Sequence, residues 1–545
     1  MHDDLVADLL REYETITGAR ANWDSHWQEI ADRVWPAHGP IFAAQGAPIS
    51  TGEKRTREMF DATAASALRK FGAILDSLLT PASQKWHRVQ ASEPALNRIR
   101  EVQEYFDEVS VALFKYRYAP QANFVGQNQM VWKSVGAFGT GALFVDALHQ
   151  SPGLRYRNLH LSEVHFTENH QGVVDSFYRK FRYTARQAAS RWPDRIPETI
   201  RSCLLTQPLR EFDFVHIVRP RNAVDPSRRD YAGMPFASYY VSVAEKVLVE
   251  EGGYFTFPCP VSRYEQAPRE IYGRSPAMDA LPAIKTLNEE KKTVLKQGQR
   301  TVDPVLLAHD DGILDEFSLL PGAVNPGGVT ADGRVLVHPL PVGNIAIGKD
   351  LMDDERVVIN DVFLVTLFQI LVETPQMTAT EVLERVKEKG ILLAPPVGRQ
   401  QSEYLGPLIE REIDVLTEQG LLPPMPGILI EARGEYRVEY DSPLSRAQRA
   451  EEAAGLMRVI ETTLQVVNVT QNPAPLDHFD WDVIVPELAA IHGVTPRWLR
   501  SLEAVQEIRQ SRAAEAEQMA TTAAAPGAAA LAKAAMMGPG TKRAA

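Results

Sequence analysis

The sequence predicts a mostly helical α+β protein, and three features of the chain support that fold class. Apolar residues at helical spacing, such as Leu5, Leu9 and Tyr13, recur through much of the first 115 residues. Short β-branched and aromatic runs separated by turn residues then follow over 138–257. Beyond Ser275, two long helical segments flank a stretch rich in glycine and proline, which predicts a helical hairpin with a small lobe at its tip.

The composition indicates a globular chain of several subdomains and disfavours a protein that coats duplex DNA. The 545 residues exceed what one hydrophobic core usually organises. They are 44% hydrophobic and 23% charged, which is typical of a folded protein. Because the formal net charge is −12, any contact with nucleic acid should be local and independent of base sequence.

Cysteine usage and hydropathy predict a soluble protein of a reducing compartment. Cys203 and Cys259 stand alone, so neither a disulfide framework nor a thiolate metal site is indicated. The first four residues are acidic where a signal peptide would be basic. The most apolar run, 357–372, is shorter than the roughly 20 residues of a membrane span and contains polar residues, so we expect a buried helix and no membrane contact.

The N-terminal half is predicted to combine helices with short strands. A helix over the first 35 residues ends at Pro36, another runs from about 62 to 79, and a third covers 94–115. Strands are expected at 142–145 and 212–218, with a helix at 184–192.

The hairpin begins where Ser275 supplies a helix cap and Pro276 the first helical position. This helix should reach about residue 300, with a kink or restart at Pro282. In the next fifty residues, twelve are glycine or proline, seven acidic and two basic, and short strands are expected at 304–307 and 334–338. A second long helix over 351–372 should stop at Pro375, and a capping box at 378–381 restarts a helix that ends at Gly390.

The rest of the chain continues the mixed pattern. A helix is predicted at 403–419, strands at 427–440 and further helices at 442–512. The last thirty-three residues, 513–545, contain fifteen alanines and predict a flexible tail.

Four strings together resemble the portal (head-to-tail connector) family of short-tailed bacteriophages. They are Phe-Gly-Thr-Gly-Ala-Leu-Phe at 138–144, Tyr-Gly-Arg-Ser-Pro-Ala-Met-Asp-Ala-Leu-Pro at 272–282, Met-Thr-Ala-Thr-Glu-Val at 377–382 and Ser-Pro-Leu-Ser-Arg-Ala-Gln-Arg at 442–449. The resemblance covers roughly residues 5–500 in matching order, which makes it far more specific than any one motif.

The resemblance implies a dodecameric ring at one capsid vertex, located in the virion and assembled in the host cytoplasm. Double-stranded DNA would pass through the ring without base readout. The terminase large subunit, tail adaptor proteins, and capsid and scaffolding proteins would be its partners, and no cofactor would be needed.

The resemblance also implies a portal fold with a wing, a two-helix stem, a small β-containing clip and a helical crown. By chain order, the parts would be N-terminal helices and α+β wing at 1–274, first stem helix at 275–300, clip at 301–350, second stem helix at 351–373, tunnel loop at 374–378, wing return helices and strands at 379–441, crown at 442–512 and the alanine-rich tail at 513–545.

Three lysines of the first stem helix form a narrow basic stripe. Lys285, Lys292 and Lys296 fall within about 40° of one another on a helical wheel, and Arg300 lies near the edge. The apolar face, which includes Leu287 and Leu295, points elsewhere. The hypothesis is that this basic stripe faces the channel and centres the DNA. The alternative is a solvated face on which Glu289 pairs with Lys285 and Lys292.

Two loop segments supply the other candidate sites. The acidic residues of the clip are interpreted as a partner-binding surface for the packaging motor, with an ordinary polar loop as the alternative: Asp310, Asp311, Asp315 and Glu316. Five residues between two predicted helices should form a tunnel loop at the narrowest part of the channel, with a plain proline kink as the alternative: Glu373, Thr374, Pro375, Gln376 and Met377.

Nothing in the sequence predicts catalysis or metal binding. Gly139-Thr140-Gly141 lacks the third glycine of a dinucleotide fingerprint and predicts a tight turn before a strand, and 538–542 is not a phosphate loop. His478, Asp480 and Asp482 favour a capped loop over a metal site, given the aromatic residues between them. We therefore expect a non-enzymatic conduit. The two alternative classes are another virion adaptor or internal scaffold, and a phage nuclease or protease. The native mass of the purified protein would distinguish these classes from a ring-forming conduit.

Overall fold

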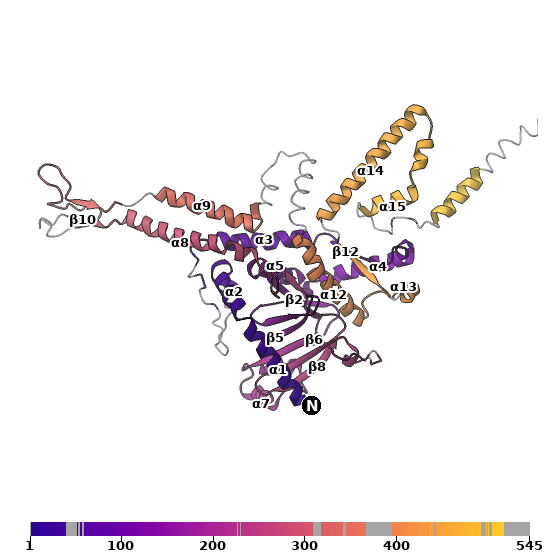
Figure 1. Ribbon diagram of the computed structural model, residues 1–545, viewed down its shortest axis with the longest axis horizontal. Coiled ribbons are helices and arrows are strands. Elements are labelled where there is room, and N and C mark those ends of the chain that lie inside the picture. Colours follow the sequence, from indigo (N-terminus) through magenta and orange to yellow (C-terminus); the bar gives the residue numbers. More distant parts are fainter. Residues whose placement is uncertain are drawn as a thin grey trace, which may run out of the picture. The chain divides into compact units, whose positions relative to one another are not determined.

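The computed structural model describes residues 2–39, 52, 55–56, 59–225, 227–228, 230–308, 318–341, 345–366, 395–432, 434–440, 443–491, 498, 500 and 504–516. Its contacts divide the chain into two compact units (Figure 1). The first unit comprises Met1–Trp86 and Val111–Leu422, and the second comprises His87–Ser110 and Pro423–Ala545.

The first unit combines helices with antiparallel sheets. Its helices are α1 (His2–Ala19), α2 (Ala21–Val34), α3 (Thr63–Leu79), α5 (Phe124–Phe138), α6 (Ala185–Arg191), α7 (Glu198–Thr206), α8 (Pro276–Val302), α9 (Ile345–Val362) and α12 (Gly406–Glu418). Its strands are β2 (Thr140–Ala147), β3 (Leu154–Leu159), β4 (Val164–Glu168), β5 (Val174–Thr184), β6 (Glu211–Pro220), β7 (Phe236–Ser242), β8 (Val247–Tyr254), β9 (Val261–Arg263), β10 (Leu306–Ala308) and β11 (Val337–Pro339). The predicted class, mostly helical α+β, is confirmed.

The N-terminal helix is shorter than predicted, because it breaks into α1 and α2 at Arg20. Arg20 is buried, and its guanidinium donates a hydrogen bond to the carbonyl of Val164 at the start of β4. The same side chain forms an ion pair with Asp24, at 2.8 Å. A contact with a strand so far along the chain cannot be deduced from helical periodicity.

The largest sheet is an antiparallel meander in the order β4-β5-β6-β7-β8. Val215 and Ile217 of β6 lie on the face covered by α1, where Leu9 is fully buried. Phe214 lies on the opposite face and packs with Trp192, next to α6. The alternation in the predicted strand 212–218 therefore places successive side chains in two separate cores.

In a second sheet, ordered β3-β2-β9, the central strand β2 is largely buried on both faces. Strand β2 shows almost no polar alternation, since both of its faces are covered by helices or by the neighbouring sheet. The strand predicted at 142–145 is confirmed within it.

The two long helices of the hairpin differ from the prediction at three points. First, α8 continues through Pro282 without a restart. Buried Leu281 and Ile284 hold the helix against the rest of the unit on both sides of this exposed proline. Second, α9 begins at Ile345 instead of residue 351. Third, it ends at Val362, before the predicted end at residue 372. Leu364 follows in a left-handed conformation, with φ 59°, so 357–372 is not one continuous helix.

The second unit contains β1 (His87–Ala91), most of α4 (Arg100–Arg117), α13 (Gly427–Glu431), β12 (Tyr436–Tyr440), α14 (Pro443–Thr470), α15 (Trp481–Ile491) and a helix at 504–516. Strand β1 pairs antiparallel with β12, which joins segments about 350 residues apart in sequence. The helix predicted over 94–115 begins only at Arg100. The side-chain amide of Asn97 accepts a hydrogen bond from the N–H of Ala91 and donates one to the carbonyl of Ala91, which holds the segment between them in a turn.

One further correction concerns 427–440, where only strands were predicted. Residues 427–431 form a short helix instead, starting after Pro426, and the strand is confined to 436–440. Proline before the first helical turn loses no hydrogen bond, so Pro426 favours this start.

Candidate functional site: the helical hairpin and its root

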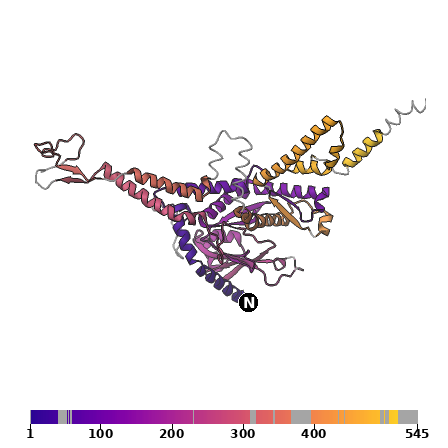
Figure 2. The ribbon, with the colours of Figure 1, turned by 45° about the horizontal axis from the view of Figure 1, so that its top comes forward.

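Helices α8 and α9 run side by side as an antiparallel hairpin that projects from the first unit (Figures 1 and 2). Strands β10 and β11 pair at the far end, in the register Leu307 opposite His338. The sequence predicted this order of helix, small β lobe and returning helix.

The root of the hairpin is held by a close approach of two backbone turns. Ser275 caps α8 by accepting a hydrogen bond from the N–H of Met278 at 3.1 Å, and its hydroxyl donates to the carbonyl of Ala137 at 2.8 Å. Gly139 ends α5 in a left-handed conformation, with φ 76°. A Cβ at this glycine would lie 2.0 Å from the carbonyl oxygen of Gly273, which no side chain tolerates.

These contacts explain why two of the family-like strings go together. The string at 138–144 forms the turn between α5 and β2, and the string at 272–282 forms the start of α8. They meet where the Gly273 N–H donates to the hydroxyl of Thr140 at 2.9 Å. Gly139-Thr140-Gly141 is thus the tight turn before a strand that the sequence predicted.

Aromatic side chains surround this turn. The indole N–H of Trp27 donates to the carbonyl of Phe138 at 3.0 Å, and the whole side chain is buried. Its ring meets Tyr272 edge-on at 5.1 Å between centroids. Helix α2 therefore supports the turn from which the hairpin departs.

A second anchor fixes both helices of the hairpin to the segment before α3. The buried Asn288 of α8 accepts hydrogen bonds from the N–H groups of Phe60 and Asp61, at 2.8 and 3.1 Å. Arg356 of α9 forms an ion pair with Asp61 at 2.7 Å. Burial alone would raise the pKa of Asp61, but hydrogen bonds from Arg356 and Thr63 outweigh it, and the pKa is lowered.

The three lysines of the basic stripe and the neighbouring Arg300 occupy two different environments. Lys285 pairs with Glu29 of α2 at 2.8 Å, and Lys292 pairs with Glu289 at 3.4 Å and lies over the ring of Phe60. Lys285 is the largest cause of a lowered pKa at Glu29. In contrast, Lys296 and Arg300 are exposed and make no ion pair with any residue that the structure describes.

Part of the predicted apolar face of α8 is in fact exposed. Leu281, Ile284 and Leu287 are buried, whereas Leu295 is 50% exposed. Val294 faces α9 in its place and lies so close to Gly348 that a Cβ there would be 2.7 Å away. The reason is that only α9 covers this outer part of α8, so a narrower stripe is buried.

The outer surface of the hairpin nevertheless carries several exposed apolar side chains. They are Leu295, Val302, Leu351, Val357 and Val358. Within α9 the two kinds of side chain alternate, because Val357 and Val358 are exposed whereas Ile359 and the following Phe363 are fully buried.

Several predicted features lie outside the described residues. These are the clip acids Asp310, Asp311, Asp315 and Glu316, the tunnel-loop residues Glu373–Met377, and the capping box at Thr378. The anchoring residues Glu29, Asp61, Asn288 and Arg356 were missed by sequence reasoning, because no local pattern marks a polar side chain that meets its partner far along the chain.

The loop around His478 behaves as a helix start. Asp480 accepts a hydrogen bond from the N–H of Asp482 at 3.0 Å, and Asp482 pairs with Arg509 at 2.7 Å. Within the described ranges, no three potential metal-ligating side chains lie close enough to share an ion. The described helices also include none with the length and apolar character needed to span a membrane.

The first unit is thus an α+β body to which a hairpin of two long helices is fixed at its root, with a two-stranded tip at the far end. The sequence profile of the bacteriophage head-to-tail connecting protein family matches residues 6–499. The chain belongs to this family.

Two curated relatives cover nearly the whole chain. A "Probable portal protein" of Bordetella phage BPP-1 is 30% identical over 529 residues, which are 95% of this chain and 92% of the relative. A "Portal protein" of Salmonella phage epsilon15 is 25% identical over 522 residues, which are 93% of this chain and 91% of the relative. The resemblance predicted from the four strings is confirmed.

Proposed function

We propose that this chain is the portal-vertex subunit of a bacteriophage, forming a ring through which viral DNA is packaged and ejected. The observation that carries the proposal is the match of the head-to-tail connecting family over 6–499, together with relatives named portal proteins. The hairpin supports it, because an elongated element rooted in a separate body can line a channel while its neighbours complete the wall.

The exposed apolar residues of the hairpin support assembly into a ring. Val302 is 88% exposed and Val357 57% exposed in the single chain. Apolar side chains in such numbers on one element mark a surface that a partner covers. In a ring, the neighbouring copies of the same hairpin cover it, and each copy uses two different faces to do so.

The charges of the basic stripe favour Lys296 and Arg300 as the DNA-facing pair. Glu29 and Glu289 largely balance Lys285 and Lys292 within the chain, so these two lysines add little net attraction. Ring symmetry would multiply Lys296 and Arg300 into two bands of positive charge. Because the chain carries a net charge of −12, the rest of the channel wall would repel the duplex and let it slide.

The remaining assignments rest on the resemblance. A dodecamer in the virion would use residues 301–350 as a clip that meets the terminase large subunit and later the tail adaptors. Capsid and scaffolding proteins would surround the wing, and assembly would take place in the host cytoplasm. The tunnel loop at 374–378 and the crown at 442–512 belong to the same proposal, in which the chain is structural and performs no catalysis.

Native mass spectrometry and axial imaging of the purified full chain test the proposal. One large ring with a central channel of at least about 20 Å, wide enough for B-DNA, is the expected result. A species that stays monomeric or dimeric at micromolar concentration would refute it. Magnesium-dependent nucleotide or DNA hydrolysis that co-purifies with the ring through stringent cleaning would refute the non-enzymatic assignment.

The DNA-facing pair is tested with the double variant Lys296→Gln/Arg300→Gln. The expected outcome is normal ring formation with altered retention of the packaged genome. The matched control is Arg186→Gln/Arg195→Gln, which removes two exposed charges from another surface of the first unit. Equal genome retention in both double variants would contradict the assignment.

A further inference from the structure

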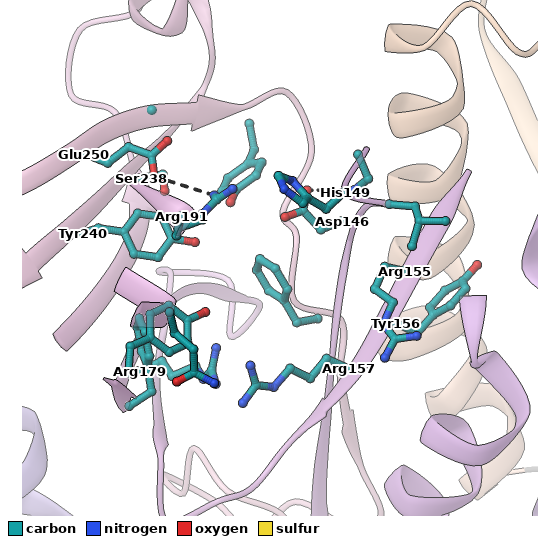
Figure 3. A pocket seen from close by; sticks show the side chains of 18 of the residues that line it. Asp146, His149, Arg155, Tyr156, Arg157, Arg179, Arg191, Ser238, Tyr240 and Glu250 are labelled. Carbon is teal, nitrogen blue, oxygen red and sulfur yellow. Dashed lines mark hydrogen bonds and ion pairs between the residues drawn. The ribbon is translucent and has the colours of Figure 1, made fainter. Parts of the chain in front are cut away.

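A cavity of about 1120 Å³ lies between the two main sheets of the first unit, away from the hairpin (Figure 3). Its walls come from β2 and β3 of one sheet, from β5, β7 and β8 of the other, and from α6. Cavities of this size hold small organic ligands in other proteins. Nothing in the proposed function uses this space.

Four arginines line the cavity, although the chain as a whole is acidic. They are Arg155 and Arg157 of β3, Arg179 of β5 and Arg191 of α6, whereas Asp146 and Glu250 are the two acidic residues among the described residues that line the cavity. Figure 3 shows Arg157 and Arg179 at one end of the cavity and Asp146, Arg191 and Glu250 toward the other. The two ends therefore differ in charge.

The end formed by Arg191 is nearly balanced. Arg191 approaches the Glu250 carboxylate at 3.6 Å, and the same carboxylate accepts a hydrogen bond from the indole of Trp192 at 2.6 Å. Burial raises the pKa of Asp146, although a hydrogen bond from the N–H of Ala147 and the charges of Arg411 and Arg191 oppose the rise. This end can accept hydrogen bonds from a ligand's hydroxyl or amino groups.

The opposite end carries more positive charge than the described acidic residues around it balance. Arg179 pairs with Glu163 at 3.1 Å, but Arg157 forms no ion pair with any described residue. Burial lowers the pKa of Arg157, and the neighbouring charge of Arg179 lowers it further, while Glu163 and Tyr183 compensate only in part. An oxyanion between the two guanidinium groups would relieve this repulsion, and planar guanidinium groups suit a phosphate especially well.

We propose that this cavity is a binding site for a small phosphate-bearing ligand, whose phosphate lies between Arg157 and Arg179 and whose hydroxyl or amino groups face Asp146 and Glu250. The aromatic side chains of Phe144, Tyr240 and Tyr254 also line the cavity. A nucleoside monophosphate combines a dianionic phosphate at one end, a flat aromatic base at the other, and hydroxyl or amino groups that donate hydrogen bonds. The site would give the portal subunit a ligand unrelated to passage of duplex DNA, which does not fit a cavity of this volume.

Isothermal titration of the full-length protein with dAMP, inorganic phosphate and sodium acetate tests the site. Binding of dAMP is expected to be tighter than that of phosphate, while acetate at equal ionic strength should not bind. Arg157→Gln should weaken dAMP binding at least about tenfold, the loss expected for a charge-assisted hydrogen bond. Arg186→Gln removes an exposed arginine from the same helix as Arg191, outside the cavity, and should leave binding unchanged.

Thermal unfolding without ligand separates this role from a structural one. Because Arg157 faces a like charge, Arg157→Gln should leave the melting temperature of the free protein equal or higher while abolishing its increase on addition of dAMP. Equal heats for acetate and phosphate, or unchanged dAMP binding by Arg157→Gln, would overturn the proposal. A single-stranded oligonucleotide that binds while dAMP does not would also overturn it, by identifying polymer phosphates as the ligand.

Discussion

Replacing Glu412 with glutamine is expected to destabilise the first unit more than almost any other single substitution. Glu412 of α12 and Arg117 at the end of α4 are both completely buried, and the Nε of Arg117 lies 2.9 and 3.1 Å from the two carboxylate oxygens. The hydroxyl of Tyr156 donates to the same carboxylate at 2.6 Å. The guanidinium lies 4.6 Å from the ring centre of Trp86, so no water replaces a lost partner.

The magnitude follows from this burial. Burial alone would lower the pKa of Arg117, but Glu412 outweighs it and holds the pKa above its ordinary value. The ordinary pKa of an arginine is above about 12, so the guanidinium stays charged even when Glu412 becomes neutral. Removing one member of a buried ion pair costs about 3–5 kcal/mol, because the other charge is left uncompensated.

Urea unfolding followed by tryptophan fluorescence measures this loss, since Trp86 lies against the ion pair. With a slope of about 3 kcal/mol/M, the unfolding midpoint should fall by about 1 M or more. The control is Glu104→Gln in the exposed Arg100–Glu104 pair on α4, which also has a 2.8 Å contact. The control substitution should lower the free energy of unfolding by less than about 0.5 kcal/mol, because the pair is exposed to solvent.

The apolar replacement Arg117→Met/Glu412→Leu/Tyr156→Phe provides the complementary result. It removes both charges and the hydroxyl together, so it should be more stable than Glu412→Gln alone. A fall of less than about 1 kcal/mol for Glu412→Gln, similar to the Glu104→Gln control, would refute the reasoning that a buried and uncompensated arginine dominates the cost.

Three further predictions concern the hairpin root and the buried core. Gly139→Ala should prevent folding of the hairpin root, because its Cβ would lie 2.0 Å from the Gly273 carbonyl; soluble expression with unchanged circular dichroism would contradict this. Asn288→Ala should lower the free energy of unfolding by about 1–3 kcal/mol, because the Phe60 and Asp61 amides lose their acceptor. Hydrogen exchange should accelerate at those two amides, while the helix start at Met278 stays protected. Burial lowers the pKa of His165 to about 3, so below the unfolded value of 6.5 the unfolded chain binds a proton that the folded chain does not. The free energy of unfolding should therefore fall as pH decreases from about 6.5 toward 3, by about 2 kcal/mol between pH 7 and pH 5, and His165→Phe should remove that part of the drop; an unchanged pH dependence would count against it.

Local signals in the sequence were enough to predict the hairpin in outline. Ser275 and Pro276 start α8 as the cap rules require, and the glycine- and proline-rich stretch separates the two helices. The alternation in 212–218 likewise predicts β6, since its side chains pack in opposite cores. Such signals depend on the chemistry of near neighbours, so they can be recognised in a single chain.

Tertiary structure alone decided the features that depend on distant partners. Arg20 ends α1 because it reaches β4, and Leu295 is exposed because Val294 faces α9. The pairing of β1 with β12 places 87–110 in the same unit as the C-terminal part of the chain, across more than three hundred residues.

The candidate sites divide in the same way. The spacing of Lys285, Lys292 and Lys296 predicts a stripe on one helix, but only the fold brings Glu29 to Lys285 and leaves Lys296 without a counter-charge among the described residues. The strands that carry Arg157 and Arg179 show no shared motif. Charges and packing partners act through space over a few ångströms, and the sequence order of residues does not determine which side chains come that close.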